Sequence, residues 1–168
     1  SEMIKSDKAK SKHFNSTNRF IDDLCALNDG NWFGKVFQEI YPPELDLKIE
    51  HSGEHGTFLN LDITVRDGIF VYKLYDKRDN FPFSIVRMPH MDSNIPKAIF
   101  YSALMGEFLR IARSTLLFED FIPKSKALLS RMIMQGAELR RLKMALRKII
   151  TKHQETFSKF KCSNEEIL

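Results

Sequence analysis

The sequence predicts an α+β protein in which short antiparallel strands come first and helices follow. Up to residue 95, turn-forming residues such as Asp67-Gly68 separate short apolar runs that suit strands. After Pro96, apolar residues recur at helical spacing instead. The chain has 168 residues, enough for one core or for a small domain with a helical appendage. A hydrophobic share of 43% excludes a collagen-like or disordered chain.

The first predicted element is a tight hairpin between residues 15 and 28. Two short strands are expected there, joined at the adjacent acids Asp22 and Asp23. A helix should follow over residues 32–40, because apolar residues recur at helical spacing and Pro42-Pro43 ends the pattern.

The middle of the chain predicts a small antiparallel meander. Strands are expected at residues 45–51, 57–66 and 69–75, with a further short strand at 81–88. Asp67-Gly68 predicts a type I′ turn, because both residues readily adopt positive φ. Between residues 58 and 65 polar and apolar residues alternate, so one face should pack and the other should face water. The 32–40 helix is the expected cover of the apolar face.

Three amphipathic helices are expected after Pro96 and should pack as a small bundle. The first contains residues 99–112, and the second covers 124–135 and stops at Gly136. The third runs from residue 138 to about residue 160.

The net charge is +4 at pH 7, and positive charge is concentrated in the helical region. Residues 122–161 contain 11 Lys or Arg and two acids. An apolar stripe in the third predicted helix should leave six cations on the surface: Arg140, Arg141, Lys143, Arg147, Lys148 and Lys152. Such a face suits the phosphate backbone of a duplex, which cations contact without reading base sequence. An ordinary solvated helix face is the alternative.

Asp22 and Asp23 stand inside an apolar, strand-like run. An ionised carboxylate is very costly to bury without a partner. The pair therefore predicts a turn at the surface or bound divalent cations, and one tight hairpin satisfies both. Mg²⁺ is the expected cation, because it is hard and prefers oxygen ligands.

Residues 19–24 resemble the Tyr-x-Asp-Asp box of reverse transcriptases, here in the form Phe-x-Asp-Asp that begins at Phe20. Further segments follow in the order found between the catalytic hairpin of the palm and the thumb in eukaryotic retroelement polymerases, at residues 41–43, 58–63, 73–79 and 93–96. The resemblance covers roughly residues 14–160. It implies the C-terminal part of the palm, plus the thumb, of an RNA-directed DNA polymerase, which is a nucleotidyltransferase.

In the resembled family the first Asp of the box is a principal Mg²⁺ ligand and the second assists, which implies these catalytic roles for Asp22 and Asp23. Phe20 and Arg87 would contact the primer, and the alternatives are strand packing for Phe20 and plain solvation for Arg87. Four parts are expected: a flexible leader at 1–13, indicated by its Lys-rich polar composition, a partial palm at 14–95, a helical thumb at 96–161 and a tail at 162–168.

Such a polymerase also needs a carboxylate from an earlier palm strand and the basic fingers, which would precede Phe14. Asp62 and Asp76 match later, noncatalytic segments and are not expected to replace the missing ligand. The chain is therefore not expected to polymerise alone, and whether it is itself an enzyme stays open. One alternative is a nonenzymatic nucleic-acid-binding or protein-interaction module derived from such a polymerase. Another is an unrelated α+β scaffold whose Asp pair is a turn.

The expected partners are an RNA–DNA or DNA duplex and the remainder of the polymerase chain. Self-association through an unpaired sheet edge is a further expectation.

Cys25 and Cys162 lack the spacing of a zinc site and are expected to be reduced. The Gly-flanked loop that contains His51 and His55 makes a poor metal site. Apolar runs are too short to cross a membrane, so we expect an intracellular protein of the nucleus or cytoplasm without a membrane partner.

Overall fold

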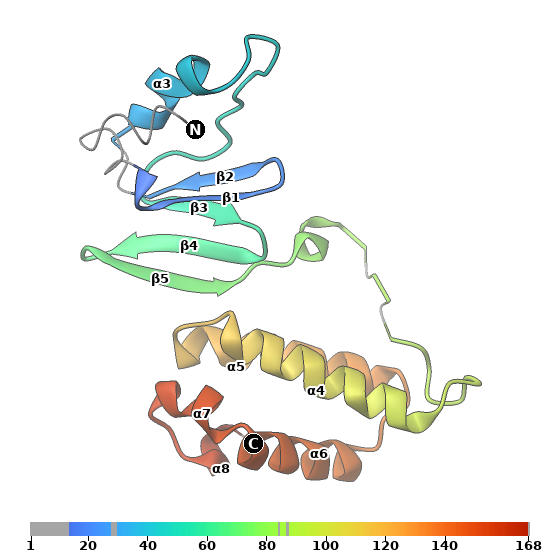
Figure 1. Ribbon diagram of the computed structural model, residues 1–168. Helices are drawn as coiled ribbons and strands as arrows, with labels where there is room; N and C mark the ends of the chain where they lie inside the picture. Colours follow the sequence, from blue (N-terminus) through green and yellow to red (C-terminus); the bar gives the residue numbers. More distant parts are fainter. Residues whose placement is uncertain (1–13, 28–29, 84, 87, 168) are drawn as a thin grey trace. The chain divides into compact units, whose positions relative to one another are not determined.

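The computed structural model describes residues 14–27, 30–83, 85–86 and 88–167 (Figure 1). It is an α+β structure in which short antiparallel strands precede helices, and this confirms the predicted fold class. The density of internal contacts divides the chain into two compact units, Ser1–Leu59 and Asn60–Leu168, called unit 1 and unit 2 below.

Unit 1 contains the predicted tight hairpin. Strand β1 (Thr17–Phe20) pairs in antiparallel register with strand β2 (Asp23–Ala26), so that Phe20 lies opposite Asp23. The backbone amide of Leu27 extends the ladder by donating to the carbonyl of Ser16 at 3.0 Å. Two residues therefore connect the strands, and the acidic pair lies at their junction.

Helix α3 (Trp32–Ile40) has the predicted bounds, because its apolar residues recur on one face and the chain becomes extended at Tyr41. Its buried residues are Phe33, Val36 and Phe37. Strand β3 (His55–Phe58) completes unit 1, and a two-residue turn at Leu59 and Asn60 follows it.

Unit 2 begins with a second hairpin, formed by strands β4 (Leu61–Arg66) and β5 (Ile69–Leu74). Their register places Leu61 opposite Leu74 and Arg66 opposite Ile69. Asp67 and Gly68 adopt φ values of 52° and 74°, as the predicted type I′ turn requires.

Several strand predictions were wrong. Residues 45–51 form no strand, and the strand predicted at 57–66 is interrupted at Leu59, whose φ is 56°. The described residues of 81–88 also form no strand. Alternating polarity produces a strand only where a neighbouring strand accepts its backbone hydrogen bonds. The predicted division into one packed and one wet face fails in β4, where residues from Leu61 to Val65 are all half-buried.

The remaining elements are helical: η2 (Lys77–Asn80), α4 (Lys97–Arg113), α5 (Phe118–Met134), α6 (Leu139–Lys152), α7 (Gln154–Phe157), η3 (Ser158–Phe160) and α8 (Asn164–Ile167). Helix α5 begins before the predicted residue 124, because Pro123 is accommodated inside it at the loss of one backbone hydrogen bond. Helix α6 ends earlier than predicted, since His153 leaves the helical region with φ −120° and ψ 39°.

Among the described residues, none of these helices has the length and apolar character needed to cross a membrane.

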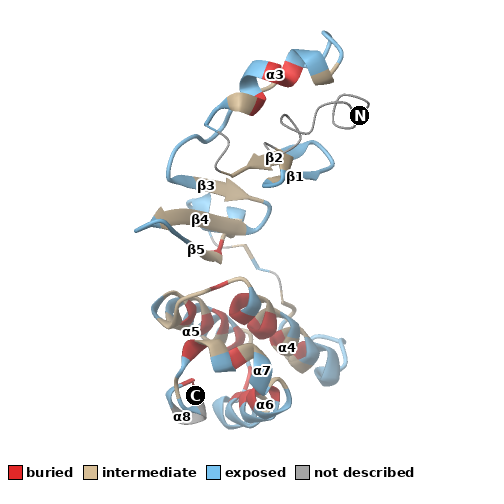
Figure 2. Ribbon diagram, turned by 60° about the vertical axis from the view of Figure 1, so that its left-hand side comes forward, coloured by how far each residue is buried: buried red, intermediate tan, exposed pale blue. Residues whose placement is uncertain are grey.

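The core of unit 2 lies where its helices face one another, as Figure 2 shows in red on α4, α5, α6 and α7. Phe108 and Phe121 are almost fully buried, with ring centroids 5.4 Å apart. Leu74 of β5 joins this core, and the amide of Leu116 donates to the carbonyl of Tyr72 at 2.9 Å. The β4–β5 hairpin is thus built into the helical unit, whereas the sequence analysis grouped it with the preceding sheet region.

Candidate functional site

The acidic pair lies at the end of the β1–β2 hairpin, where Ile21 and Asp22 form the turn and Asp23 begins the returning strand. Ile21 adopts φ 56°, a left-handed conformation that is an outlier for a β-branched residue. Its side chain is 74% exposed, and both carboxylates are exposed as well. Backbone strain of this kind clusters at functional sites, since it persists only where the surroundings enforce it.

Asp22 and Asp23 offer only part of a metal cage. In the described part of the chain neither carboxylate has a hydrogen-bond or ion-pair partner, so both are available as oxygen ligands. The described residues contain no cluster of three or more His, Cys, Asp or Glu side chains suited to a metal ion. Mg²⁺ takes six oxygen ligands, and sites for it combine one or two carboxylates with waters and substrate phosphates. The chemistry of the pair fits this pattern.

Arg19 is a residue at this turn that the sequence analysis did not single out. Its Nε donates to the backbone carbonyl of Ile21 at 2.8 Å, and its Nη1 donates to the hydroxyl of Tyr41 at 3.2 Å. The signal in the sequence was an arginine beside the box, but its partner Tyr41 is 22 residues away and only the folded chain brings them together.

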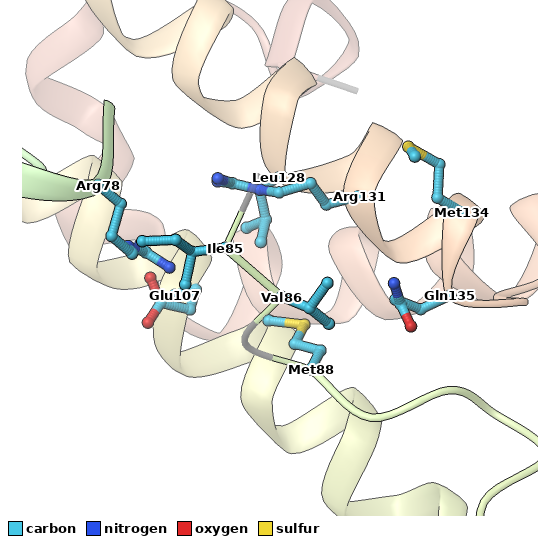
Figure 3. Close-up of a pocket in the computed structure, with 9 residues that line it drawn as sticks. All are labelled: Arg78, Ile85, Val86, Met88, Glu107, Leu128, Arg131, Met134 and Gln135. Carbon is cyan, nitrogen blue, oxygen red and sulfur yellow. The ribbon is translucent and has the colours of Figure 1, made fainter. Parts of the chain in front are cut away.

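Of the two predicted primer-contact residues, the structure describes only Phe20. Phe20 is 53% exposed, so the alternative of core packing is not realised. Arg87 lies outside the described residues. Its described neighbours Ile85, Val86 and Met88 line a cavity of about 590 Å³, counted with its open side. Figure 3 shows Ile85, Val86 and Met88 on one side of this cavity and side chains of α4 and α5 on the other, with the charged residues Arg78, Glu107 and Arg131 at its edge.

Three acids of the β4–η2 region, Asp62, Asp76 and Asp79, form ion pairs. Asp62 lies 3.7 Å from the Nζ of Lys73. Asp76 accepts hydrogen bonds from the side chain and backbone of Arg78, and the side-chain bond is the main reason that the pKa of Asp76 falls from 3.8 to about 2. Asp79 pairs with Lys124 of α5. Asp76 therefore pairs with a residue two positions away, while Asp79 uses a partner distant in sequence.

The six predicted cations of α6 are all exposed, and they define the α6 cationic surface: Arg140, Arg141, Lys143, Arg147, Lys148 and Lys152. The opposite face of α6 is buried through Leu142, Leu146, Ile149 and Ile150, whereas the predicted stripe residue Leu139 is 55% exposed. At 100° per residue the cations form two rows. Arg140, Lys143 and Arg147 lie on one flank, and Arg141, Lys148 and Lys152 lie on the other.

Little negative charge offsets the α6 cationic surface. Arg141 lies 3.2 Å from Glu138, and in the described part of the chain the other five cations have no ion-pair partner. Lys143 and Arg147 are four residues apart, as are Lys148 and Lys152, and like charges at this spacing destabilise a helix. A polyanion would relieve this repulsion, and phosphates would take the place of the missing acids.

Within the described ranges, the histidines and cysteines form no cluster suited to a metal ion. His51 Nε2 lies 3.1 Å from the hydroxyl of Thr57, and the rings of His51 and His55 are 6.3 Å apart. Cys25 and Cys162 are free thiols, as predicted, and burial raises the pKa of both. A raised pKa makes a thiol less reactive, because the thiolate is the nucleophile.

Comparison with known proteins found no match for this chain among family models, curated proteins or solved structures.

Proposed function

We propose that this chain is part of an RNA-directed DNA polymerase, to which it contributes two metal-binding aspartates and a surface for the primer–template duplex. The observation that carries the proposal is the placement of Asp22 and Asp23 at an exposed two-residue turn between antiparallel strands. The strained backbone of the turn costs stability, and binding of a cation by its two exposed carboxylates would explain why it is kept.

In this role Asp22 and Asp23 supply carboxylate oxygens to a metal cage that other parts of the polymerase complete. Mg²⁺ held there would align the primer hydroxyl and neutralise charge on the incoming triphosphate. Phe20, exposed beside the pair, offers an aromatic surface at the same turn. A polymerase that lacked the remaining carboxylate could not complete the cage, so the chain is not proposed to polymerise alone.

The α6 cationic surface is the proposed contact with the duplex. Its two rows of cations suit phosphates, and phosphate contacts let a protein hold a duplex of any sequence. Between the rows Met144 is 51% exposed and Thr151 is exposed, so the charge available to phosphates comes from the two rows themselves. The surface therefore favours binding without sequence preference, as a polymerase requires.

The metal role is tested in a complete polymerase that contains this region. Asp22→Asn should abolish DNA synthesis with little change in affinity for an RNA–DNA hybrid, because the substitution removes a metal ligand and leaves the duplex surface intact. Asp46→Asn, at an exposed acid outside the turn, should retain synthesis. Synthesis by the Asp22→Asn polymerase at the wild-type rate would refute the assignment.

The duplex role is tested with this chain, by fluorescence anisotropy of a labelled RNA–DNA hybrid over a series of KCl concentrations. Replacing Arg147 and Lys148 with Gln should weaken binding and reduce the slope of log affinity against log salt by roughly two. Replacing the exposed Lys97 and Arg113 of α4 with Gln removes the same charge and should leave the slope nearly unchanged. Equal effects of the two double substitutions would argue against a specific role of α6.

A nonenzymatic nucleic-acid-binding module is the second candidate. The α6 cationic surface favours it, because that surface does not depend on the acidic pair. Hybrid binding that is lost on substitution in α6, together with no DNA synthesis by a longer chain that retains Asp22 and Asp23, would select this function.

A further inference from the structure

Arg19 is an exposed strand residue whose guanidinium is nevertheless held by specific contacts. An exposed arginine ordinarily keeps its side chain solvated and free to change rotamer. In this protein Nε donates to the carbonyl of Ile21 at 2.8 Å, and Nη1 donates to the hydroxyl of Tyr41 at 3.2 Å. The guanidinium carbon also lies 5.5 Å from the centre of the Tyr41 ring.

We propose that Arg19 is a positioning residue that holds the Ile21–Asp22 turn in its strained conformation and thereby sets the direction of the Asp22 and Asp23 carboxylates. Tyr41 anchors Arg19 in this role. The inference rests on the proposed metal-binding function of the pair, although the conformation of the turn can be measured without any metal.

Arg19 makes its backbone hydrogen bond to the strained residue itself. Ile21 has φ 56°, and its carbonyl is the acceptor of the Arg19 Nε hydrogen bond. A β-branched residue reaches this conformation at a cost, because its Cβ approaches the backbone. A hydrogen bond from a charged donor is stronger than one from a neutral donor, so the bond to this carbonyl offsets part of the cost.

A chain of contacts links the turn to the buried face of α3. The Tyr41 ring stacks on the ring of Phe37, with centroids 4.7 Å apart and an angle of 24° between the planes. Phe37 is 7% exposed and packs beside Phe33, with centroids 6.1 Å apart. The buried rings therefore fix Tyr41, Tyr41 fixes Arg19, and Arg19 fixes the carbonyl of Ile21.

Arg19 does not act as a counterion of the acidic pair. Its guanidinium donates to two neutral oxygens, and in the part of the chain that the structure describes it forms no ion pair with Asp22 or Asp23. An arginine that paired with these carboxylates would compete with a cation for the same oxygens. Bonding to a carbonyl and a phenol leaves the carboxylates free.

Lysine cannot replace arginine in this geometry. Guanidinium has several donors in a fixed plane and can bond two acceptors while it stacks on a ring, whereas ammonium is a compact point charge. Arg19→Lys therefore keeps the charge and removes the geometry. Tyr41→Phe keeps the stacked ring and removes the hydroxyl acceptor.

The test uses nuclear magnetic resonance on this chain, with two readouts in each variant. A strong intraresidue NOE between the amide and α protons of Ile21 reports its positive φ, and Mn²⁺ added alone reports metal binding through line broadening at Asp22 and Asp23. Arg19→Lys and Arg19→Gln should both weaken the NOE and lower Mn²⁺ affinity roughly tenfold, as loss of a group that orients metal ligands does. Tyr41→Phe should have a smaller effect in the same direction.

Arg66→Lys is the matched control, because Arg66 is also an exposed strand residue next to a hairpin turn. It should change neither readout. An unchanged Ile21 NOE in Arg19→Lys, Arg19→Gln and Tyr41→Phe would overturn the positioning role. Absence of Mn²⁺ broadening in the wild-type chain, with the NOE lost in the Arg19 variants, would instead remove the metal-binding function and leave the positioning of the turn established.

Discussion

The carboxylate of Asp76 is ion-paired, whereas those of Asp22 and Asp23 have no ion-pair partner among the described residues, and this distinguishes the roles of the three residues. Asp76 is 13% exposed and is held by Arg78, so its charge supports the native structure. Asp22 and Asp23 are exposed at a strained turn without a described partner. The first arrangement is typical of a structural ion pair, and the second leaves carboxylate oxygens free, as the proposed metal-binding role requires.

Asp76 should make stability depend on pH. Its pKa in the folded chain is about 2, below the ordinary value of 3.8, so its contribution is complete above pH 3.8 and is lost as the pH falls toward 2. The shift corresponds to about 2 kcal/mol. Asp76→Asn should therefore lower the free energy of unfolding at pH 7 by up to about 2 kcal/mol, with the difference shrinking in acid.

Urea denaturation of the wild-type chain and of Asp76→Asn at pH 7, pH 4 and pH 2 measures this dependence. Asp46→Asn is the control, because Asp46 is exposed in an irregular segment. A difference between wild type and Asp76→Asn that stays constant from pH 7 to pH 2 would show that the ion pair is not its cause.

Among the elements, the connection between α5 and α6 has the most clearly defined geometry. Gly136 has φ 88°, its amide donates to the carbonyl of Ile133, and the amide of Ala137 donates to the carbonyl of Met132. This pair of bonds is the Schellman motif, which ends a helix at a residue in the left-handed conformation. The carbonyl of Gln135 accepts from the amide of Met91 at 2.8 Å, so the preceding loop is fastened to the same place.

Two glycine substitutions should have opposite effects on stability. A Cβ at Gly136 would lie 3.1 Å from the His90 ring at a positive φ, so Gly136→Ala should lower the free energy of unfolding by about 1–2 kcal/mol. A Cβ at Gly106, inside α4, meets no atom within 4 Å. Gly106→Ala should therefore raise the free energy by about 0.5–1 kcal/mol through helix propensity.

Chemical denaturation followed by far-UV circular dichroism gives both values under one set of conditions. Stabilisation by Gly136→Ala would mean that the left-handed conformation at this position is not maintained in solution.

For the whole molecule, the division into two units predicts two separable transitions. Trp32 is the single tryptophan and lies in unit 1, where its ring centroid is 5.1 Å from that of Phe14. The long helices α4, α5 and α6 all lie in unit 2 and dominate the circular dichroism. Fluorescence and dichroism therefore report different units.

Removal of a buried ring from one unit should shift the unfolding transition reported by the probe of that unit more than the transition reported by the other probe. Phe37→Ala should mainly move the fluorescence transition, and Phe108→Ala should lower the stability seen by dichroism by about 3–5 kcal/mol. Phe81→Ala removes a ring that is 50% exposed and should move neither transition appreciably. Coincident shifts of both probes in Phe37→Ala and Phe108→Ala would mean that the chain unfolds as one cooperative unit.

Local features of the fold and of the candidate site could be predicted from the sequence. The acidic hairpin, helix α3, the Asp67-Gly68 turn and the stop at Gly136 each depend on residues close together in the chain. Their φ preferences and apolar spacing act over a few residues, which explains why pattern reasoning located them. The cations of α6 were found for the same reason, since helical period alone places them opposite the apolar stripe.

The remaining features depend on distant partners, and only the tertiary structure decided them. Residues 45–51 alternate like a strand but form none, while Pro123 lies inside α5 although proline usually ends a helix. Asp79 pairs with Lys124, and Arg19 reaches Tyr41. Sequence by itself determined the α+β class, the acidic turn and the basic helix, because backbone preferences and side-chain period are local. Tertiary structure decided which strands pair, where helices end and what holds the turn, because those outcomes require partners that the chain supplies only when folded.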